Sequence, residues 1–170
     1  MVKYDTKFGG AAVGYDRLNG RSLAGATDTV LPAGLTSSAK SDARLTINGY
    51  VNLADVKVAA GVIRRKNEGS MTRPKSDLWF EGAVYTASPS WTIDATFSKL
   101  GYKDVSNFDS TLITLRAVYK LSKRTSMYAQ AGTIRNGSLT NVSVSAGAPG
   151  SNRVLGGSQT GTMLGINHVF

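Results

Sequence analysis

Apolar and polar residues alternate along most of this chain, in segments of about ten residues. Residues 44–53 place Leu45, Ile47, Gly49, Val51 and Leu53 at every second position, with polar or charged residues between most of them. Successive side chains of a β-strand point to opposite faces, so this segment predicts a strand with one apolar and one polar face. Helical periodicity is hard to find anywhere. The pattern therefore predicts an all-β protein.

The same alternation recurs along the chain, with turn residues between the segments. Residues 56–63 continue it after a tight link at Ala54-Asp55, and in residues 78–85 the set Leu78, Phe80, Gly82, Val84 opposes the set Trp79, Glu81, Ala83, Tyr85. Further strands are predicted over 91–98, 112–120, 126–131 and 161–170. With a less regular first strand from Lys3 to about Tyr15, we expect an antiparallel sheet of about eight strands.

Short and long connections alternate strictly. The connections near residues 54, 89 and 122 are a few residues long, whereas those over 18–42, 66–76, 101–109 and 135–159 are longer and rich in Gly, Ser, Asn and charge. Outer-membrane barrels combine tight periplasmic turns with longer extracellular loops. This regularity predicts a transmembrane β-barrel whose first strand here rises from the periplasmic side.

The apolar face is predicted to contact lipid. It is rich in Gly, Ala and Val, whereas a soluble core needs bulkier side chains to reach its packing density. Trp91 and Tyr119 lie near the short turns, as interfacial aromatic residues do. The last strand places Leu164, Ile166, His168 and Phe170 on one face, which we interpret as a C-terminal membrane-insertion signature. A small non-conducting eight-stranded outer-membrane barrel and a soluble lipocalin-like binding barrel remain alternatives.

Composition narrows the function. A chain of 170 residues fits one domain, 1–170, and contains no run of the roughly 18 apolar residues that a membrane helix needs. It has no cysteine and one histidine, so we expect no catalytic constellation, metal site or cofactor. The formal net charge is +9, but the basic residues are spread over strands and loops without an aromatic-rich basic platform, and we expect no nucleic-acid partner.

Three segments resemble the general porins of β-proteobacteria, of the Neisseria, Burkholderia and Comamonas type. Residues 119–128 (YKLSKRTSMY) resemble that family's penultimate periplasmic turn, residues 157–170 (GSQTGTMLGINHVF) its closing strand, and residues 87–91 (ASPSW) another of its turns. The resemblance implies the C-terminal half of a sixteen-stranded, trimeric barrel in the outer membrane of a Gram-negative bacterium, without the family's N-terminal constriction loop. Asn167 departs from the pattern, which usually has a basic residue there.

The polar face is then expected to line water. Its candidate pore-lining residues are Arg44, Lys57, Arg65, Glu81, Asp94, Arg116 and Lys120, with Lys3, Asp5 and Lys7 on the same register. Basic groups in a pore raise the local anion concentration, so we predict passive diffusion of ions and small hydrophilic solutes with a weak anion preference and no enzymatic activity. Alternatively, these charges are ordinary solvated side chains without influence on selectivity.

Overall fold

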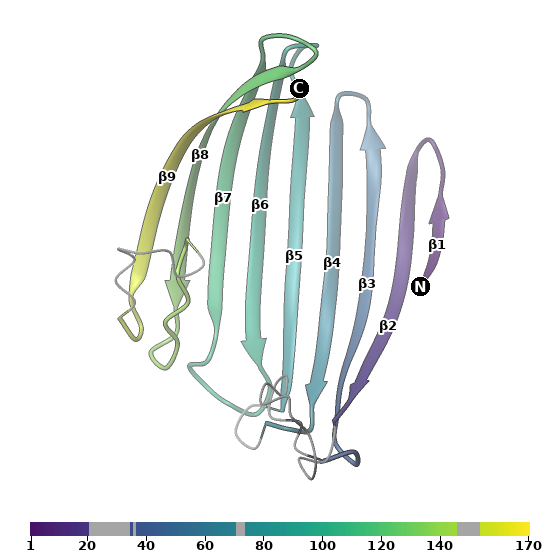
Figure 1. Cartoon of the computed structure of the whole chain (residues 1–170), viewed down its shortest axis with the longest axis vertical. Helices are drawn as coiled ribbons and strands as arrows, with labels where there is room; N and C mark the ends of the chain where they lie inside the picture. Colours follow the sequence, from purple (N-terminus) through teal and green to yellow (C-terminus); the bar gives the residue numbers. More distant parts are fainter. Residues whose placement is uncertain (21–34, 36, 71–73, 146–153) are drawn as a thin grey trace.

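Among the residues that the computed structural model describes, nine strands pair in chain order into one antiparallel sheet (Figure 1). The structure describes residues 1–20, 35, 37–70, 74–145 and 154–170. Among the described residues there is no helix long and apolar enough to cross a membrane. The strands are β1 (Val2–Asp5), β2 (Gly9–Asn19), β3 (Ser41–Leu53), β4 (Val56–Asn67), β5 (Lys75–Thr86), β6 (Trp91–Tyr102), β7 (Ser110–Lys120), β8 (Thr125–Asn136) and β9 (Ser158–His168).

The predicted all-β antiparallel class is confirmed, and against the expected eight or so strands the described part of the chain has nine. The segment predicted as one strand, Lys3 to about Tyr15, is a hairpin of β1 and β2. Its turn is closed by Thr6, whose backbone N–H donates to the Gly9 carbonyl at 2.8 Å and whose hydroxyl oxygen accepts the Phe8 and Gly9 N–H groups. Threonine side chains form such turns, so Thr6 was the available signal.

The two ends of the sheet differ as the connections predict. The short turns at residues 6–8, 54–55, 87–90 and 121–124 lie at one end together with the C-terminus, and the long connections lie at the other (Figure 1). Ala54 makes the tightest turn with a positive φ of 50°. We call these the short-turn end and the long-loop end.

Cross-strand pairing fixes which residues share a face, because directly paired residues point to the same side. Ile47 pairs with Val62, Val62 with Trp79, and the row continues across the sheet. This apolar face carries large exposed side chains in every part of the sheet. They include Val13, Ile47, Val51, Leu53, Val58, Trp79, Ile93, Ile113, Leu115, Leu164 and Ile166.

Few hydrophobic side chains are hidden. Among the described residues only Leu35 and Ile134 are buried hydrophobic residues, so the sheet has no internal core of the kind that a soluble barrel packs. From Leu45 to Leu53 the apolar stripe of β3 runs eight residue steps, about 26 Å at about 3.3 Å per step. That length matches the apolar band of an outer-membrane barrel, about 25 Å.

Candidate functional site

The polar face is the side on which six of the seven predicted pore-lining residues lie. Four cross-strand pairs place them there: Arg44 with Arg65, Lys57 with Asn52, Asp94 with Arg116, and Lys120 with Ser126. The predicted position of Glu81 is wrong. Glu81 pairs with Ala60 and Phe97 and lies on the apolar face in the middle of β5.

At the long-loop end, a buried carboxylate holds two arginines. Asp42 is 3% exposed and accepts two bonds from Arg65, Nε–Oδ1 at 2.8 Å and Nη2–Oδ2 at 2.7 Å. The Nη2 of Arg44 lies 3.4 Å from the same Oδ2. Such a two-point pair fixes the guanidinium plane, and the cluster of two arginines and one aspartate keeps one positive charge in excess.

At the short-turn end, Lys57 stacks on an aromatic ring. Its Nζ lies 3.8 Å from the centroid of Tyr50, a distance at which the ring attracts the ammonium group. The Tyr50 hydroxyl donates to Asp5, which also binds Lys3. Side chains of strands β1, β3 and β4 thus form one polar network. Tyr50 is uncharged, so its contact with Lys57 leaves the positive charge of the lysine in place.

Asp94 and Arg116 form the central ion pair of the polar face. The Arg116 Nε donates to Asp94 Oδ2 at 2.8 Å, and the Arg116 side chain stays 47% exposed while that of Asp94 is 14% exposed. Both residues line a hollow of about 490 Å³ together with Lys57, and Arg116 also borders a second hollow of about 540 Å³ near Tyr128 and Gln130. Arg116 therefore lies between two open depressions of the polar face.

Aromatic side chains cover glycines on this same face. Tyr50 pairs with Gly10, Phe80 with Gly61 and Tyr128 with Gly165. A Cβ added at Gly61 would lie 2.5 Å from the Phe80 ring, so the ring packs directly on the glycine backbone. An aromatic residue that covers a cross-strand glycine is a known way to fix register. This packing explains why Phe80, a large apolar residue, faces the polar side.

The connection between β8 and β9 folds onto the polar face. The Asn136 amide donates to the carbonyls of Val142 and Gly157, and the Val144 N–H donates to the Gln159 side-chain oxygen at 3.2 Å. A Cβ added at Gly161 would meet Val144 at 3.2 Å. The described part of this loop, residues 137–145, therefore covers part of the polar face.

The predicted C-terminal residues gather at the short-turn end. Leu164 and Ile166 are 83% and 68% exposed on the apolar face, and His168 continues this row. The rings of His168 and Phe170 lie 4.8 Å apart in an edge-to-face arrangement, close to the hydrogen bond between His168 Nδ1 and Thr125. The rings of Trp91 and Tyr119 are 4.9 Å apart at the same end. The strand ends at His168, two residues earlier than predicted.

Sequence reasoning missed three members of the site. The alternation places Asp42 in a connection and Phe80 on the side opposite Glu81, and it does not single out Tyr50. Asp42 had a visible signal, since it starts the alternation that leads into residues 44–53. Within the part of the chain that the structure describes, no three His, Cys, Asp or Glu residues are grouped to hold a metal ion.

Comparison with known proteins agrees with this geometry. The family described as Gram-negative porin matches residues 2–139. A search of curated proteins found no significant match. Among solved structures, the anion-selective porin from Comamonas acidovorans matches 99% of this chain and 47% of its own, with a TM-score of 0.76 and 20% identity.

The outer membrane protein OmpT of Vibrio cholerae, in a trimer form folded in vitro, matches 98% of this chain and 54% of its own, with a TM-score of 0.63 and 13% identity. The chain spans about half the length of these structures, and at such identities the likeness concerns the fold. The family match covers most of the sequence. The chain therefore belongs to the Gram-negative porin family, proteins of the bacterial outer membrane.

Proposed function

We propose that this chain forms part of the wall of a water-filled channel for passive diffusion of ions and small hydrophilic solutes, without enzymatic activity. One observation carries the proposal. The two faces of a single sheet differ over its central part, where one carries mostly exposed aliphatic and aromatic residues and the other carries polar groups and the Asp94–Arg116 ion pair. Such a sheet separates lipid from water, and a closed wall of this kind encloses an aqueous lumen.

Closing the wall requires more strands than the structure describes. In the strand order, β1 and β9 each have one neighbour, so each leaves an edge open. Open edges do not occur in the hydrocarbon region, because their N–H and C=O groups would lack partners. The similarity to about half of each solved structure supports closure by a second set of strands into a barrel of about sixteen, wide enough to hold water. The trimer form of one neighbour supports a homotrimer.

The charges of the polar face support a weak anion preference of the proposed channel. Its strands carry the basic residues Lys3, Arg44, Lys57, Arg65, Arg116 and Lys120, against the acidic residues Asp5, Asp16, Asp42 and Asp94. Lys3 is paired with Asp5 and Arg116 with Asp94, and Asp16 lies opposite Arg44 beside Asp42, which leaves an excess of two positive charges at Lys57 and Lys120. Screening over about 8 Å at physiological salt limits the effect. The similar structure from Comamonas acidovorans is an anion-selective porin, which supports a preference for anions over cations in this chain as well.

Reversal potentials across a planar bilayer test both parts of the proposal. Arg116→Ser combined with Lys120→Ser removes two cations and leaves Asp94 without its arginine, so the potential should shift toward cations in a KCl gradient. The control combines Lys123→Ser with Arg124→Ser, which removes the same charge from the exposed turn between β7 and β8. An unchanged reversal potential in the Arg116→Ser, Lys120→Ser variant would contradict the proposed anion preference. Absence of any conductance from the closed barrel would remove the channel.

A further inference from the structure

The apolar face carries its basic residues at one end only. Within the described strands, every Lys and Arg of this face lies toward the long-loop end, and none lies among the aromatic residues of the short-turn end. These residues are Arg17, Arg64, Lys66, Lys75, Lys99 and Arg135, and Lys103 follows directly after β6. A charged side chain facing lipid is costly at the bilayer centre and nearly free at the interface. Their position therefore marks the interface at the long-loop end.

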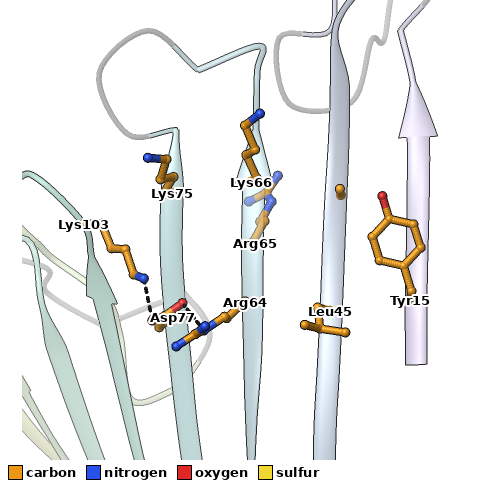
Figure 2. Close-up of a pocket in the computed structure, with 9 residues that line it drawn as sticks. Tyr15, Leu45, Arg64, Arg65, Lys66, Lys75, Asp77 and Lys103 are labelled. Atoms are coloured by element: carbon orange, nitrogen blue, oxygen red, sulfur yellow. Dashed lines mark ion pairs between the residues drawn. The ribbon is translucent and has the colours of Figure 1, made fainter. Parts of the chain in front are cut away.

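Four of these cations surround a hollow of about 350 Å³. Arg64, Lys66, Lys75 and Lys103 border it from β4, β5 and the end of β6, and Tyr15 and Leu45 lie on its other side (Figure 2). The hollow is thus basic on one side and apolar on the other. Arg65 also borders it, but its guanidinium is bound to Asp42 on the polar face.

One carboxylate organises the basic side of the hollow. Asp77, whose side chain is 17% exposed, lies 3.6 Å from Arg64 Nε and 3.5 Å from Lys103 Nζ (Figure 2). Arg64 and Lys103 remain 56% and 48% exposed, so each can contact a further anion. Lys66 binds Glu68 at 2.9 Å and Lys75 is exposed. The four cations exceed the two acids, and the site keeps a net positive charge.

We propose that this hollow binds a phosphate-bearing lipid of the outer leaflet, with Arg64, Lys75 and Lys103 on the phosphate and Leu45 and Tyr15 against its acyl chains. The inference rests on the proposed function and on the orientation expected from the connections, since outer-membrane barrels place their longer loops on the extracellular side. Charge complementarity selects an anionic head group, and the adjacent apolar surface selects a lipid over a soluble anion. Asp77 is a positioning residue that holds Arg64 and Lys103 at the edge of the hollow.

The test measures lipid binding to the chain in detergent micelles by native mass spectrometry. The probes are diphosphorylated lipid A, the same lipid after removal of its phosphates, and inorganic phosphate. The cluster variant combines Arg64→Ser, Lys75→Ser and Lys103→Ser. Each basic residue near an anionic surface contributes about fivefold in affinity, the equivalent of about 1 kcal/mol, so binding of the diphosphorylated lipid should weaken about a hundredfold.

The control variant combines Lys7→Ser, Lys123→Ser and Arg124→Ser, which removes the same charge from turns at the short-turn end and should bind as the parent chain does. Parent and cluster variant should bind the dephosphorylated lipid equally weakly. Equal binding of the diphosphorylated lipid by both would overturn the proposal. So would displacement of the lipid by millimolar inorganic phosphate, which indicates a site for free anions, or a change in oligomer size without a change in lipid binding, which indicates a contact with a second copy.

Two additions keep the result interpretable. If the cluster variant does not fold, Lys75→Glu alone reverses an exposed charge and should weaken binding at least about tenfold; unchanged affinity would contradict the site. Conductance of the closed barrel is recorded for the same variants. A barrel that conducts but binds no lipid removes this inference alone, whereas lipid binding without conductance removes the proposed channel and leaves the site.

Discussion

Replacing Leu115 with arginine measures whether the apolar face contacts lipid. Leu115 is the middle residue of β7, is 55% exposed, and lies between Ala95 and Ala131. If acyl chains surround it, Leu115→Arg puts a charge near the bilayer midplane, at a cost of about 2–4 kcal/mol in unfolding free energy. If water surrounds it, a substitution at so exposed a position should change stability by less than about 0.5 kcal/mol.

The matched control is Ser98→Arg. Ser98 lies in the neighbouring strand on the polar face and borders the hollow of about 490 Å³, which has room for a guanidinium group. Both variants are unfolded with guanidinium chloride in phospholipid vesicles, and the fluorescence of Trp79 and Trp91, the two tryptophans of the chain, reports the transition. A loss of less than about 1 kcal/mol for Leu115→Arg, or an equal loss for Ser98→Arg, would refute the assignment of the two faces.

Four further predictions follow from single features of the sheet. Gly61→Val should cost about 1–3 kcal/mol because its side chain meets Phe80 and Asn48, whereas Gly101→Ala, with nothing within 4 Å of its new Cβ, should cost far less; equal losses in denaturant titrations would contradict the packing. Glu81→Leu should raise the unfolding free energy in vesicles, by less than about 2 kcal/mol, because it removes a carboxylate from the apolar face; a loss of stability would instead reveal a partner for Glu81. Hydrogen bonds from Lys66 and Ser41 lower the pKa of Glu68, in the loop after β4, from 4.5 to about 2. The stabilising contribution of this carboxylate is therefore complete above about pH 4.5 and is lost as the pH falls toward about 2. The difference in unfolding free energy between the parent chain and Glu68→Gln should vanish over that window and persist at about pH 6. Brominated acyl chains should quench both Trp79 and Trp91, which lie on the apolar face, and water-soluble acrylamide quenching both more strongly would contradict it.

Strands β3 and β4 show where prediction from the sequence succeeds. The faces of β3 and β4 follow from alternation alone, because one parity carries Leu45, Ile47 and Val51 and the other carries Arg44, Asn48 and Asn52. The alternation of short and long connections likewise predicted which ends of the strands lie together. These features are local, since a strand's side-chain period and a turn's composition depend on residues that are neighbours in the chain.

The face of β5 could not be obtained that way. Both parities of residues 78–85 carry bulky apolar side chains, so alternation does not distinguish them, and Glu81 was assigned to the wrong side. Pairing with β4 decides the matter: it sets Phe80 on Gly61 and Trp79 beside Val62. A shift of the β4–β5 register by one residue would exchange the two faces of β5 and remove the Phe80 ring from Gly61.

The amino-acid sequence by itself determined most of the strands and turns and the apolar stripe of β3 and β4, because each arises from short-range periodicity. The tertiary structure alone decided which charges meet. Asp42 and Arg65 are separated by 23 residues, and Asp94 and Arg116 by 22. The register of neighbouring strands brings these groups within hydrogen-bond distance, and register depends on the sum of contacts along two whole strands rather than on any single segment.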